Sequence, residues 1–361
     1  MFARAARKPG TPAYLEYYGR RPERLADDER MRGMPGLLEP GGRAFDETAS
    51  GNARGWFRRI DEWTPGSDVE RLAGAVAKTG DLTALLTATA RSLGAVATGC
   101  CEVDPMWVYS HKGRFDDDYG RVIDAGRRPH AIVFLVEMDH AQMSRAPMAE
   151  AIRESARQYY RAAAIARTID AALRAADIDA RAHYDAHYDV VLPPMAVAAG
   201  LGELGRHNIL IADRFGTRVR IGAVTMAAPL RADRRRNLGV RAFCARCRKC
   251  ADNCPPRALS AGSPVDVNGV EKWPTDVERC YRYWRLMGTD CGVCMAVCPF
   301  SHPDNALHNA VRRLARALPG LAPAFVWADD AVYGRAWDRR RGLFRRRPAR
   351  PSVPAGPPTG P

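Results

Sequence analysis

Eight of the ten cysteines in this 361-residue chain lie between Cys244 and Cys298. The first run has the spacing C-x2-C-x2-C-x3-C-P, which supplies thiolates to [4Fe–4S] clusters in bacterial ferredoxins. A lone Cys280 follows, and then a second run with the spacing C-x2-C-x3-C-P. In two-cluster ferredoxins the last cysteine of each run binds the other cluster. We therefore predict one cluster on Cys244, Cys247, Cys250 and Cys298, and a second on Cys254, Cys280, Cys291 and Cys294.

Two other uses of clustered cysteines fit this sequence less well. Pairs at C-x2-C spacing also bind zinc, but both runs end in x3-C-Pro and no histidine stands at zinc-finger distance. Disulfide frameworks are typical of small secreted domains, whereas this chain is long and shows no export signal. The remaining pair, Cys100 and Cys101, is adjacent in a predicted strand, so we expect two small buried side chains on opposite faces.

Composition indicates a globular chain with an excess of basic residues. Hydrophobic residues make up 46% of it, and no apolar run reaches the ~20 residues of a membrane span. Because no export or twin-arginine signal is found, and because such clusters suit a reducing compartment, we expect a cytoplasmic protein. Part of the formal charge of +14 is local, in an Arg-rich and Pro-rich tail that we expect to be disordered. Nucleic-acid binding is considered for this tail alone.

The residues before the cysteines carry the pattern of an α/β core. Helices are predicted from 82 to 93, with Asp81 as the N-cap, and from 148 to 177. Strands are predicted at 95–103, 131–136, 178–183, 209–212 and 219–226. Since 131–136 is apolar throughout, we expect a central strand that is covered on both faces. Helices alternating with apolar strands place the fold in the α/β class, with the cluster module inserted after the core.

The chain divides into segments by composition and pattern. We predict an irregular N-terminal wrap, the α/β core, the double-cluster module, an amphipathic helix with a segment that returns to the core, and the basic tail (1–80, 81–240, 241–305, 306–334 and 335–361).

Glycines within the core give the spacing G-x-G-x-x-G. No acidic residue follows a strand about 20 residues later, so the dinucleotide-binding fingerprint is incomplete. We expect instead a turn at which the backbone closely approaches something else, since glycine permits such contact. The candidate cofactor-binding residues are Gly200, Gly202, Gly205 and His207.

Several segments together resemble the reductive dehalogenases, which are corrinoid and iron–sulfur enzymes that remove halogens from organic halides. The segments are 104–111 (DPMWVYSH), 134–139 (FLVEMD), 196–230 and both cysteine runs. The resemblance implies a nitroreductase-like, corrinoid-binding core that holds cobalamin, with two clusters relaying electrons to the cobalt. It also implies a halogenated organic substrate and a ferredoxin-like or flavodoxin-like electron donor.

The same resemblance implies a tyrosine that gives a proton to the substrate carbon and a basic residue that lowers the pKa of this tyrosine. Tyr159 lies on an apolar stripe of the predicted long helix and is the first candidate, with Tyr160 in reserve. Arg218, after the glycine turn, is the candidate basic partner.

A related family, the epoxyqueuosine reductases, shares the double cluster pattern. The dipeptide His207-Asn208 after the glycine turn is closer to that family, and Asp189 imperfectly matches its proton donor. We favour the dehalogenase. The alternatives are an epoxyqueuosine-reductase-like, tRNA-modifying enzyme and a non-catalytic electron-transfer protein.

Overall fold

The computed structural model describes residues 2–114, 118–267, 270–338 and 343–345. At its centre is a four-stranded sheet with the order β1-β2-β6-β3, in which all neighbouring strands are antiparallel. The strands are β1 (Ala97–Glu102), β2 (His130–Glu137), β3 (Ala180–His183) and β6 (Val219–Met226). The predicted positions of these four strands are confirmed. The fold is thus a mixed α/β fold built on an antiparallel sheet.

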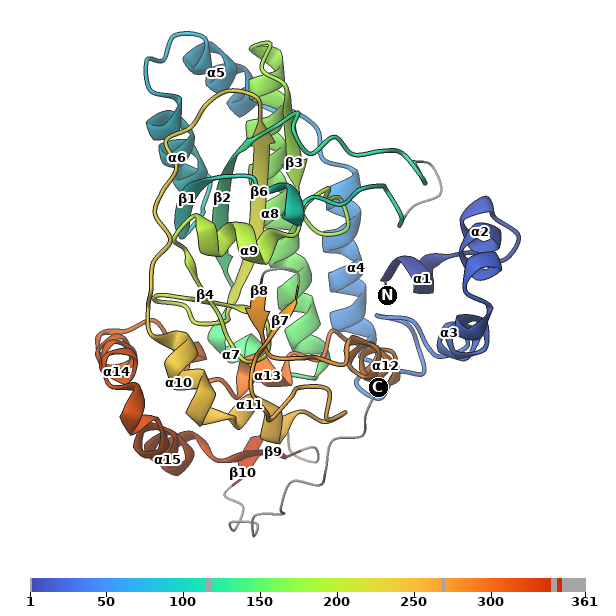
Figure 1. Cartoon of the computed structure of the whole chain (residues 1–361), viewed down its shortest axis with the longest axis vertical. Helices are drawn as coiled ribbons and strands as arrows, with labels where there is room; N and C mark the ends of the chain where they lie inside the picture. Colours follow the sequence, from blue (N-terminus) through green and yellow to red (C-terminus); the bar gives the residue numbers. More distant parts are fainter. Residues whose placement is uncertain (1, 115–117, 268–269, 339–342, 346–361) are drawn as a thin grey trace.

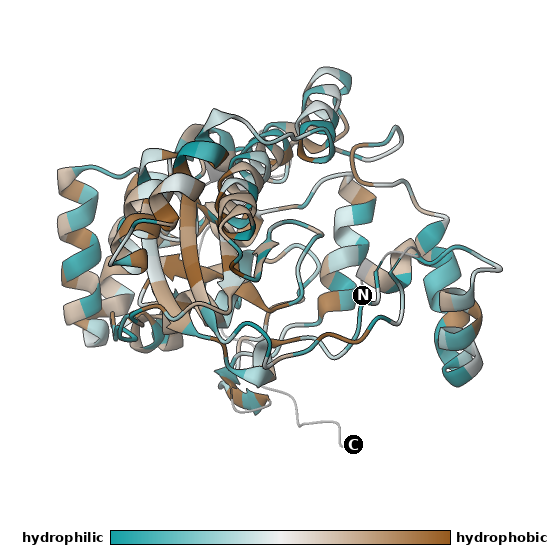
Figure 2. Cartoon of the chain, turned by 90° about the horizontal axis from the view of Figure 1, so that it is seen from above, coloured by the Kyte–Doolittle hydropathy of each residue, from teal (hydrophilic) through white to brown (hydrophobic). Residues whose placement is uncertain are grey.

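Helices cover both faces of the sheet, and Figure 2 shows the apolar strands enclosed between them. One face packs against α5 (Ser67–Val76), α6 (Leu82–Ser92) and α8 (Ala149–Ala175), and the opposite face packs against α9 (Leu192–Ala198). Residues 131–136 are completely buried, which confirms the central strand. Cys100 and Cys101 are buried on opposite faces, also as predicted.

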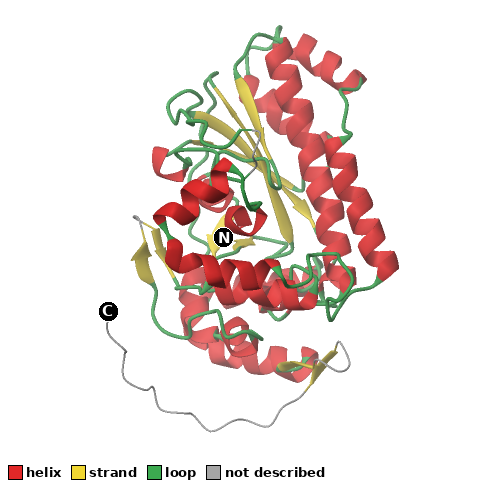
Figure 3. Ribbon diagram, turned by 90° about the vertical axis from the view of Figure 1, so that its right-hand side faces the viewer, coloured by secondary structure: helices red, strands yellow, loops and turns green. Residues whose placement is uncertain are grey.

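The predicted long helix is confirmed as α8, whose 27 residues run the length of the core (Figure 3). Its two apolar stripes are both used. One packs on the sheet, and the other packs against α4 (Glu47–Asp61). The predicted helix 82–93 is confirmed as α6, where the Asp81 carboxylate accepts a hydrogen bond from the Ala84 N–H at 3.0 Å.

The N-terminal segment is mostly helical, so the expectation of an irregular wrap is wrong. In addition to α4 and α5 it forms α1 (Phe2–Ala6), α2 (Pro12–Arg20) and α3 (Leu25–Arg32). Its prolines and glycines mostly mark helix starts and connections instead of breaking the helices. The segment still covers other parts of the chain: α4 lies along α8, and the Ala44 N–H donates to the Met287 carbonyl at 2.9 Å.

The cysteine-containing module follows the sheet and lies at one end of it (Figure 1). Its elements are α10 (Val240–Cys247), α11 (Lys249–Asn253), β7 (Val265–Val267), β8 (Val270–Lys272), α12 (Val277–Met287) and α13 (Val293–Ala296). The module meets the turn before β6 closely. A β-carbon at Gly216, whose φ is +58°, would lie 2.0 Å from the Phe300 carbonyl oxygen. Glycine is therefore required where the core and the module meet.

Two elements differ from their predicted surroundings. The predicted strand 209–212 exists as β5 (Leu210–Ala212), but it pairs with β4 (Gly202–Leu204) outside the main sheet. The amphipathic helix predicted to return to the core is α14 (Ala306–Ala317), which packs with α15 (Ala322–Tyr333) mainly on α10 of the module.

The predicted disordered tail lies mostly outside the described residues. Its described part includes two short paired strands, β9 (Ala336–Asp338) and β10 (Leu343–Arg345). Across the described ranges, no helix is both long and apolar enough to span a bilayer.

Candidate functional site

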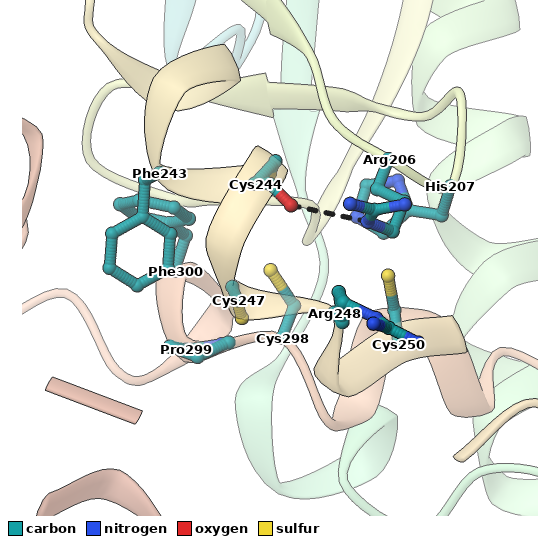
Figure 4. A pocket seen from close by; sticks show the side chains of 10 residues that line it. All are labelled: Arg206, His207, Phe243, Cys244, Cys247, Arg248, Cys250, Cys298, Pro299 and Phe300. Carbon is teal, nitrogen blue, oxygen red and sulfur yellow. Dashed lines mark hydrogen bonds between the residues drawn. The ribbon is translucent and has the colours of Figure 1, made fainter. Parts of the chain in front are cut away.

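Four cysteines line one small cavity in the module (Figure 4). Cys244 and Cys247 come from α10 and Cys250 from α11, while Cys298 comes from the second run. Arg248 separates the two helices with a left-handed φ of 54°, and this turn carries the chain around the cavity. These four residues, called the first set below, are the ones predicted to bind one cluster. Their grouping is geometric, and their role as iron ligands is our proposal.

The other four cysteines, Cys254, Cys280, Cys291 and Cys294, form the second set. Burial and the neighbouring Cys254 raise the pKa of the Cys280 thiol to about 11. Burial raises the pKa of Cys294 still further, with added contributions from Cys291, Cys280 and Cys254. Mutual electrostatic effects of this kind require the thiols to be near one another. This grouping is the one that the predicted exchange of the last cysteines requires, and the binding of two clusters by these sets stays a prediction.

The donor sets fit iron–sulfur clusters chemically. Burial holds these thiols protonated, whereas a metal ligand must be a thiolate. The positive charge of bound iron would offset the cost of forming several buried thiolates at one place. Among the described residues, no three Cys, His, Asp or Glu side chains are arranged to hold a single metal ion. In a [4Fe–4S] cluster each of the four thiolates binds a different iron atom, so the sulfur atoms need not converge on one metal position.

Buried cations surround the first set. Arg206 is 2% exposed and donates to four carbonyl oxygens, including those of Cys244 at 3.1 Å and Ala245 at 3.1 Å. Lys249 is also buried, and it pairs with Asp329 and Asp330. Because the charge of Lys249 is already paired, Arg206 is the cation that would partly balance the negative charge of a cluster with four thiolates.

A second polar site lies where α8, β6 and the module meet. The guanidinium of Arg220 lies over the ring of Tyr159, with its carbon 4.5 Å from the ring centroid. The same guanidinium donates to Ser155 Oγ at 2.6 Å and to Asp290 Oδ2 at 2.9 Å. Asp290 directly precedes Cys291. Arg220 therefore contacts both Tyr159 and the residue that precedes the second run of cysteines.

Arg218 is not the basic partner of Tyr159, so this prediction is wrong. It is 2% exposed and donates to the carbonyl oxygens of Met138 at 2.6 Å, Ser301 at 2.6 Å and His302 at 3.1 Å. Arg218 also pairs with Glu137. These bonds join the end of β2 to the residues that follow Cys298. Arg218 therefore holds the core and the module together through buried hydrogen bonds.

The surroundings of Tyr159 also correct the expected direction of its pKa shift. Burial has the largest effect and raises the pKa of the phenol well above its usual value, although Arg220 opposes this rise. The expectation of a lowered pKa is therefore wrong, because loss of hydration outweighs the nearby charge. Tyr159 keeps its proton at neutral pH. Tyr160 instead packs on Trp56, with ring centroids 5.3 Å apart.

The glycine turn packs against the protein itself. A β-carbon at Gly200 would lie 2.7 Å from the Arg234 carbonyl oxygen, and one at Gly202 would lie 2.4 Å from that of Ile211. At Gly205 the close neighbour is the ring of His207, at 2.7 Å. The close approach predicted for this turn is present. The neighbours are protein atoms, so the three glycines do not form the cradle of a cofactor.

Two further candidates have defined surroundings. His207 lines the cavity of the first set, its buried Nε2 has no hydrogen-bond partner, and burial lowers its pKa to about 4. Asp189 is buried and pairs with Lys112 and Arg181. Burial would raise the pKa of Asp189, but the two cations outweigh it and lower the pKa. A carboxylate held ionised in this way is a poor proton donor.

Comparison with known proteins agrees with this geometry. The model of the 4Fe-4S dicluster domain matches residues 243–302, which include all eight cysteines. A tetrachloroethene reductive dehalogenase of Desulfitobacterium hafniense is 34% identical over 235 residues, which cover 62% of this chain and 42% of that protein. Over this part of its length the chain is similar to the reductive dehalogenases. It spans less than half the length of this curated relative. More distant similarity extends to epoxyqueuosine reductases.

Solved structures of reductive dehalogenases share the fold. A catabolic reductive dehalogenase in complex with 3-bromo-4-hydroxybenzoic acid is 30% identical, with a TM-score of 0.63 over 73% of this chain and 37% of that one. Another, described as suggesting a mechanism for B12-dependent dehalogenation, is 26% identical, with a TM-score of 0.68 over 88% of this chain and 47% of that one.

Proposed function

We propose that this protein is an iron–sulfur oxidoreductase that removes a halogen from an organic halide. Two electrons pass singly through the [4Fe–4S] clusters of the first and second sets. The carbon–halogen bond breaks, the halogen leaves as halide, and one proton is added to the carbon. Tyr159 donates this proton, and the phenol is reprotonated from solvent. The single observation that carries the proposal is the contact chain from Tyr159 through Arg220 to Asp290, the residue that precedes Cys291 of the second set.

The order of the two sets supports this assignment. Cys294 of the second set also contributes to the raised pKa of Cys250 in the first, so the sets adjoin one another. Electrons that enter at the first set would therefore have a short route to the second. The second set is in turn next to the ion pair that contacts Tyr159. This arrangement favours a relay that delivers electrons to a substrate bound near the tyrosine, which supplies the proton.

Tyr159 is suited to donate a proton late in the reaction. Since burial raises its pKa, the phenol does not ionise at neutral pH before charge develops on the substrate carbon. As the phenolate forms, Arg220 is already in place to stabilise the negative charge. The arginine thus assists the transition state without removing the proton from the ground state.

A corrinoid enters this proposal through family resemblance. It would supply the reduced metal centre that attacks the organic halide. The residues expected to bind it do not form a cradle, because the three glycines of the turn are closed against Arg234, Ile211 and His207. We therefore assign no residue of this chain to the corrinoid and no step to the glycine turn.

The proposal is tested with protein purified anaerobically and reconstituted with iron, sulfide and cobalamin. Electron paramagnetic resonance should show two reduced clusters. Bromide release from 3-bromo-4-hydroxybenzoic acid, with reduced methyl viologen as the electron source, should then be measured by ion chromatography. Tyr159→Phe should slow bromide release by about a hundredfold or more, the usual range for loss of a general acid.

Tyr160→Phe is the matched control, since Tyr160 is the next residue of α8 and packs on Trp56 instead. This variant should release bromide at nearly the normal rate. Full turnover by Tyr159→Phe would rule out this tyrosine as the donor. Two cluster signals without halide release from brominated or chlorinated substrates would instead favour an electron-transfer protein.

A further inference from the structure

The helix α14 exposes its apolar side chains instead of burying them. Leu307 is 70% exposed, Val311 44%, Leu314 51% and Leu318 43%. These positions are separated by four, three and four residues, so they form one stripe along the helix. Leu321, in the turn after α14, is 53% exposed and extends the stripe. We call these five residues the α14 apolar face. A contiguous exposed stripe of this kind is typical of an interaction site.

The opposite side of α14 is fixed by a buried arginine. Arg312 is 2% exposed and donates to the carbonyl oxygens of Phe300 at 3.0 Å and Pro303 at 3.1 Å. Its other amino group donates to Asn309 Oδ1 at 2.7 Å. Turning the apolar stripe inward would break these bonds and leave the buried carbonyl groups unpaired. The outward direction of the stripe is therefore built into the packing of the helix.

The side of α14 opposite to the apolar face packs on the part of the module that carries the first set. Ala315 of α14 and Ala322 of α15 belong to the same buried cluster as Phe243, Cys244 and Cys298. The two helices lie at the outer edge of the module, next to α10 (Figure 1). A protein docked there would thus lie on the outer side of α14, and α14 packs directly on α10, the helix that carries Cys244 and Cys247.

The border of this face carries more positive than negative charge. A surface groove at the end of α14 is lined by Arg236, Arg313, Arg316 and Asp213, among others. Arg236 and Arg316 share the one carboxylate, while Arg313 is exposed beside Leu314. An apolar stripe beside a basic border is complementary to a small acidic protein with an apolar patch.

We propose that the α14 apolar face docks a small acidic electron-carrier protein that reduces the cluster of the first set. This inference rests on the proposed function, because it requires a cluster at the first set. The step itself is one electron lost by the reduced carrier and one gained by the oxidised cluster, with no atom transferred. The position of α14 beside α10, which carries two cysteines of the first set, favours an electron carrier over a membrane or a second copy of this chain.

Reduction by two different reagents tests this docking site. Flavodoxin reduced to its hydroquinone serves as the protein probe, and dithionite serves as a small reductant that needs no docking. Stopped-flow bleaching of the clusters is followed in the reconstituted full chain and in Leu314→Glu. We expect this variant to lower the second-order rate with flavodoxin by about tenfold or more, since the new charge repels an acidic carrier. Its rate with dithionite should not change.

Leu15→Glu is the matched control, because Leu15 is 62% exposed on α2, in the N-terminal segment. This variant should be reduced by flavodoxin at the normal rate. Binding of oxidised flavodoxin, measured by isothermal titration calorimetry, gives a readout that does not require electron transfer. Binding should weaken in Leu314→Glu and also in Arg313→Glu, and it should weaken in the unmodified chain as ionic strength rises.

Each remaining outcome has a definite meaning. Equal flavodoxin rates for Leu314→Glu and the unmodified chain would overturn the docking site. So would a failure of flavodoxin to reduce the unmodified chain while dithionite does so. Binding to anionic lipid vesicles, or self-association, that Leu314→Glu abolishes without changing the flavodoxin rate would assign the face to that other occupant. Failure of dithionite to bleach any cluster would count against the proposed function itself.

Discussion

The two cysteine sets have different electrostatic surroundings. Beside the first set, Arg206 and Lys249 are buried cations. Beside the second set is Asp290, whose charge is paired with Arg220. Because Lys249 is already paired with Asp329 and Asp330, the net positive charge beside the first set comes from Arg206, while the ion pair beside the second set also contacts Tyr159. In the proposed function the first set receives electrons and the second delivers them, and this difference in surroundings is consistent with that order.

Two arginines near the start of β6 contact different cysteine sets. Arg218 bonds to the residues that follow Cys298 of the first set. Arg220 bonds to Asp290, which precedes Cys291 of the second set. Each arginine therefore ties the core to one set. Only Arg220 also contacts a side chain that can donate a proton, so we expect one arginine to affect stability and the other turnover.

Loss of single cysteines should produce the largest effects and tests whether the two sets are correctly composed. Cys244→Ala and Cys298→Ala should each lose about four irons and leave the same remaining cluster spectrum, because both belong to the first set. Cys254→Ala and Cys291→Ala should share a different spectrum. Iron analysis and electron paramagnetic resonance measure both quantities. If Cys298→Ala instead matches Cys291→Ala, the exchange of cysteines between the runs is incorrect.

Arg218→Met should be the next most severe change. We expect the free energy of unfolding to fall by about 3 kcal/mol, because several buried carbonyl groups and Glu137 lose their partner. Urea unfolding of the cluster-containing protein, followed anaerobically by circular dichroism, measures this loss. Arg214→Met is the control, since its ion pair with Asp304 is exposed and should contribute less than about 1 kcal/mol. Equal losses of stability in the two variants would show that the buried bonds of Arg218 stabilise the fold no more than the exposed Arg214–Asp304 pair does.

Most of the fold could be predicted because its elements have strong local signals. Asp81 before a leucine-rich segment predicts α6, and the unbroken apolar run at 131–136 predicts the central strand β2. The N-terminal segment was harder, since composition alone suggested an irregular chain. Its helices depend on tertiary contacts such as the packing of α4 on α8, which no local pattern reveals.

The cysteine sets could be grouped from spacing, whereas the basic partner of Tyr159 was misassigned. A signal for the correct residue was present in the alternation of β6. Val224 and Met226 face α8, so Arg220 lies on the same face as these two residues. Arg218 precedes the strand, and the turn there directs it toward the module. Asp290 had no such signal, because its contact with Arg220 joins segments 70 residues apart.

Arg220→Met should lower turnover by about tenfold to a hundredfold without a comparable loss of stability. The guanidinium of Arg220 lowers the pKa of Tyr159 and so offsets part of the rise that burial causes. Without it the pKa rises further, and the phenol becomes a weaker acid. Arg220→Lys keeps the charge and should recover part of the rate. Bromide release at saturating substrate measures both variants. An unchanged rate in Arg220→Met would show that the contact with Tyr159 has no catalytic effect.

The pH profile of turnover sharpens the assignment of Tyr159. A proton donor is active only while protonated, so activity would be lost as the pH rises through its pKa. Because burial raises this pKa above the usual value of about 10, Tyr159 should cause no loss of turnover between pH 7 and about 9. Initial rates of bromide release across this range measure the effect. An alkaline loss within it that moves to higher pH in Arg220→Met would show that Tyr159 ionises there, contrary to the burial argument.

Arg248→Met should give the smallest effect and tests the charge difference between the two sets directly. Arg248 is exposed at the cavity of the first set, so its positive charge favours the reduced, more negative cluster. Its removal should lower the reduction potential of that cluster by roughly a few tens of millivolts and leave the other nearly unchanged. Redox titration followed by electron paramagnetic resonance measures the reduction potential of each cluster separately. Arg71→Met on α5 is the control. Since solvent ions screen an exposed charge, the shift should shrink at high salt. An equal shift of both clusters would mean that this charge acts on the whole module, and the proposed contrast between the two sets would lose its electrostatic basis.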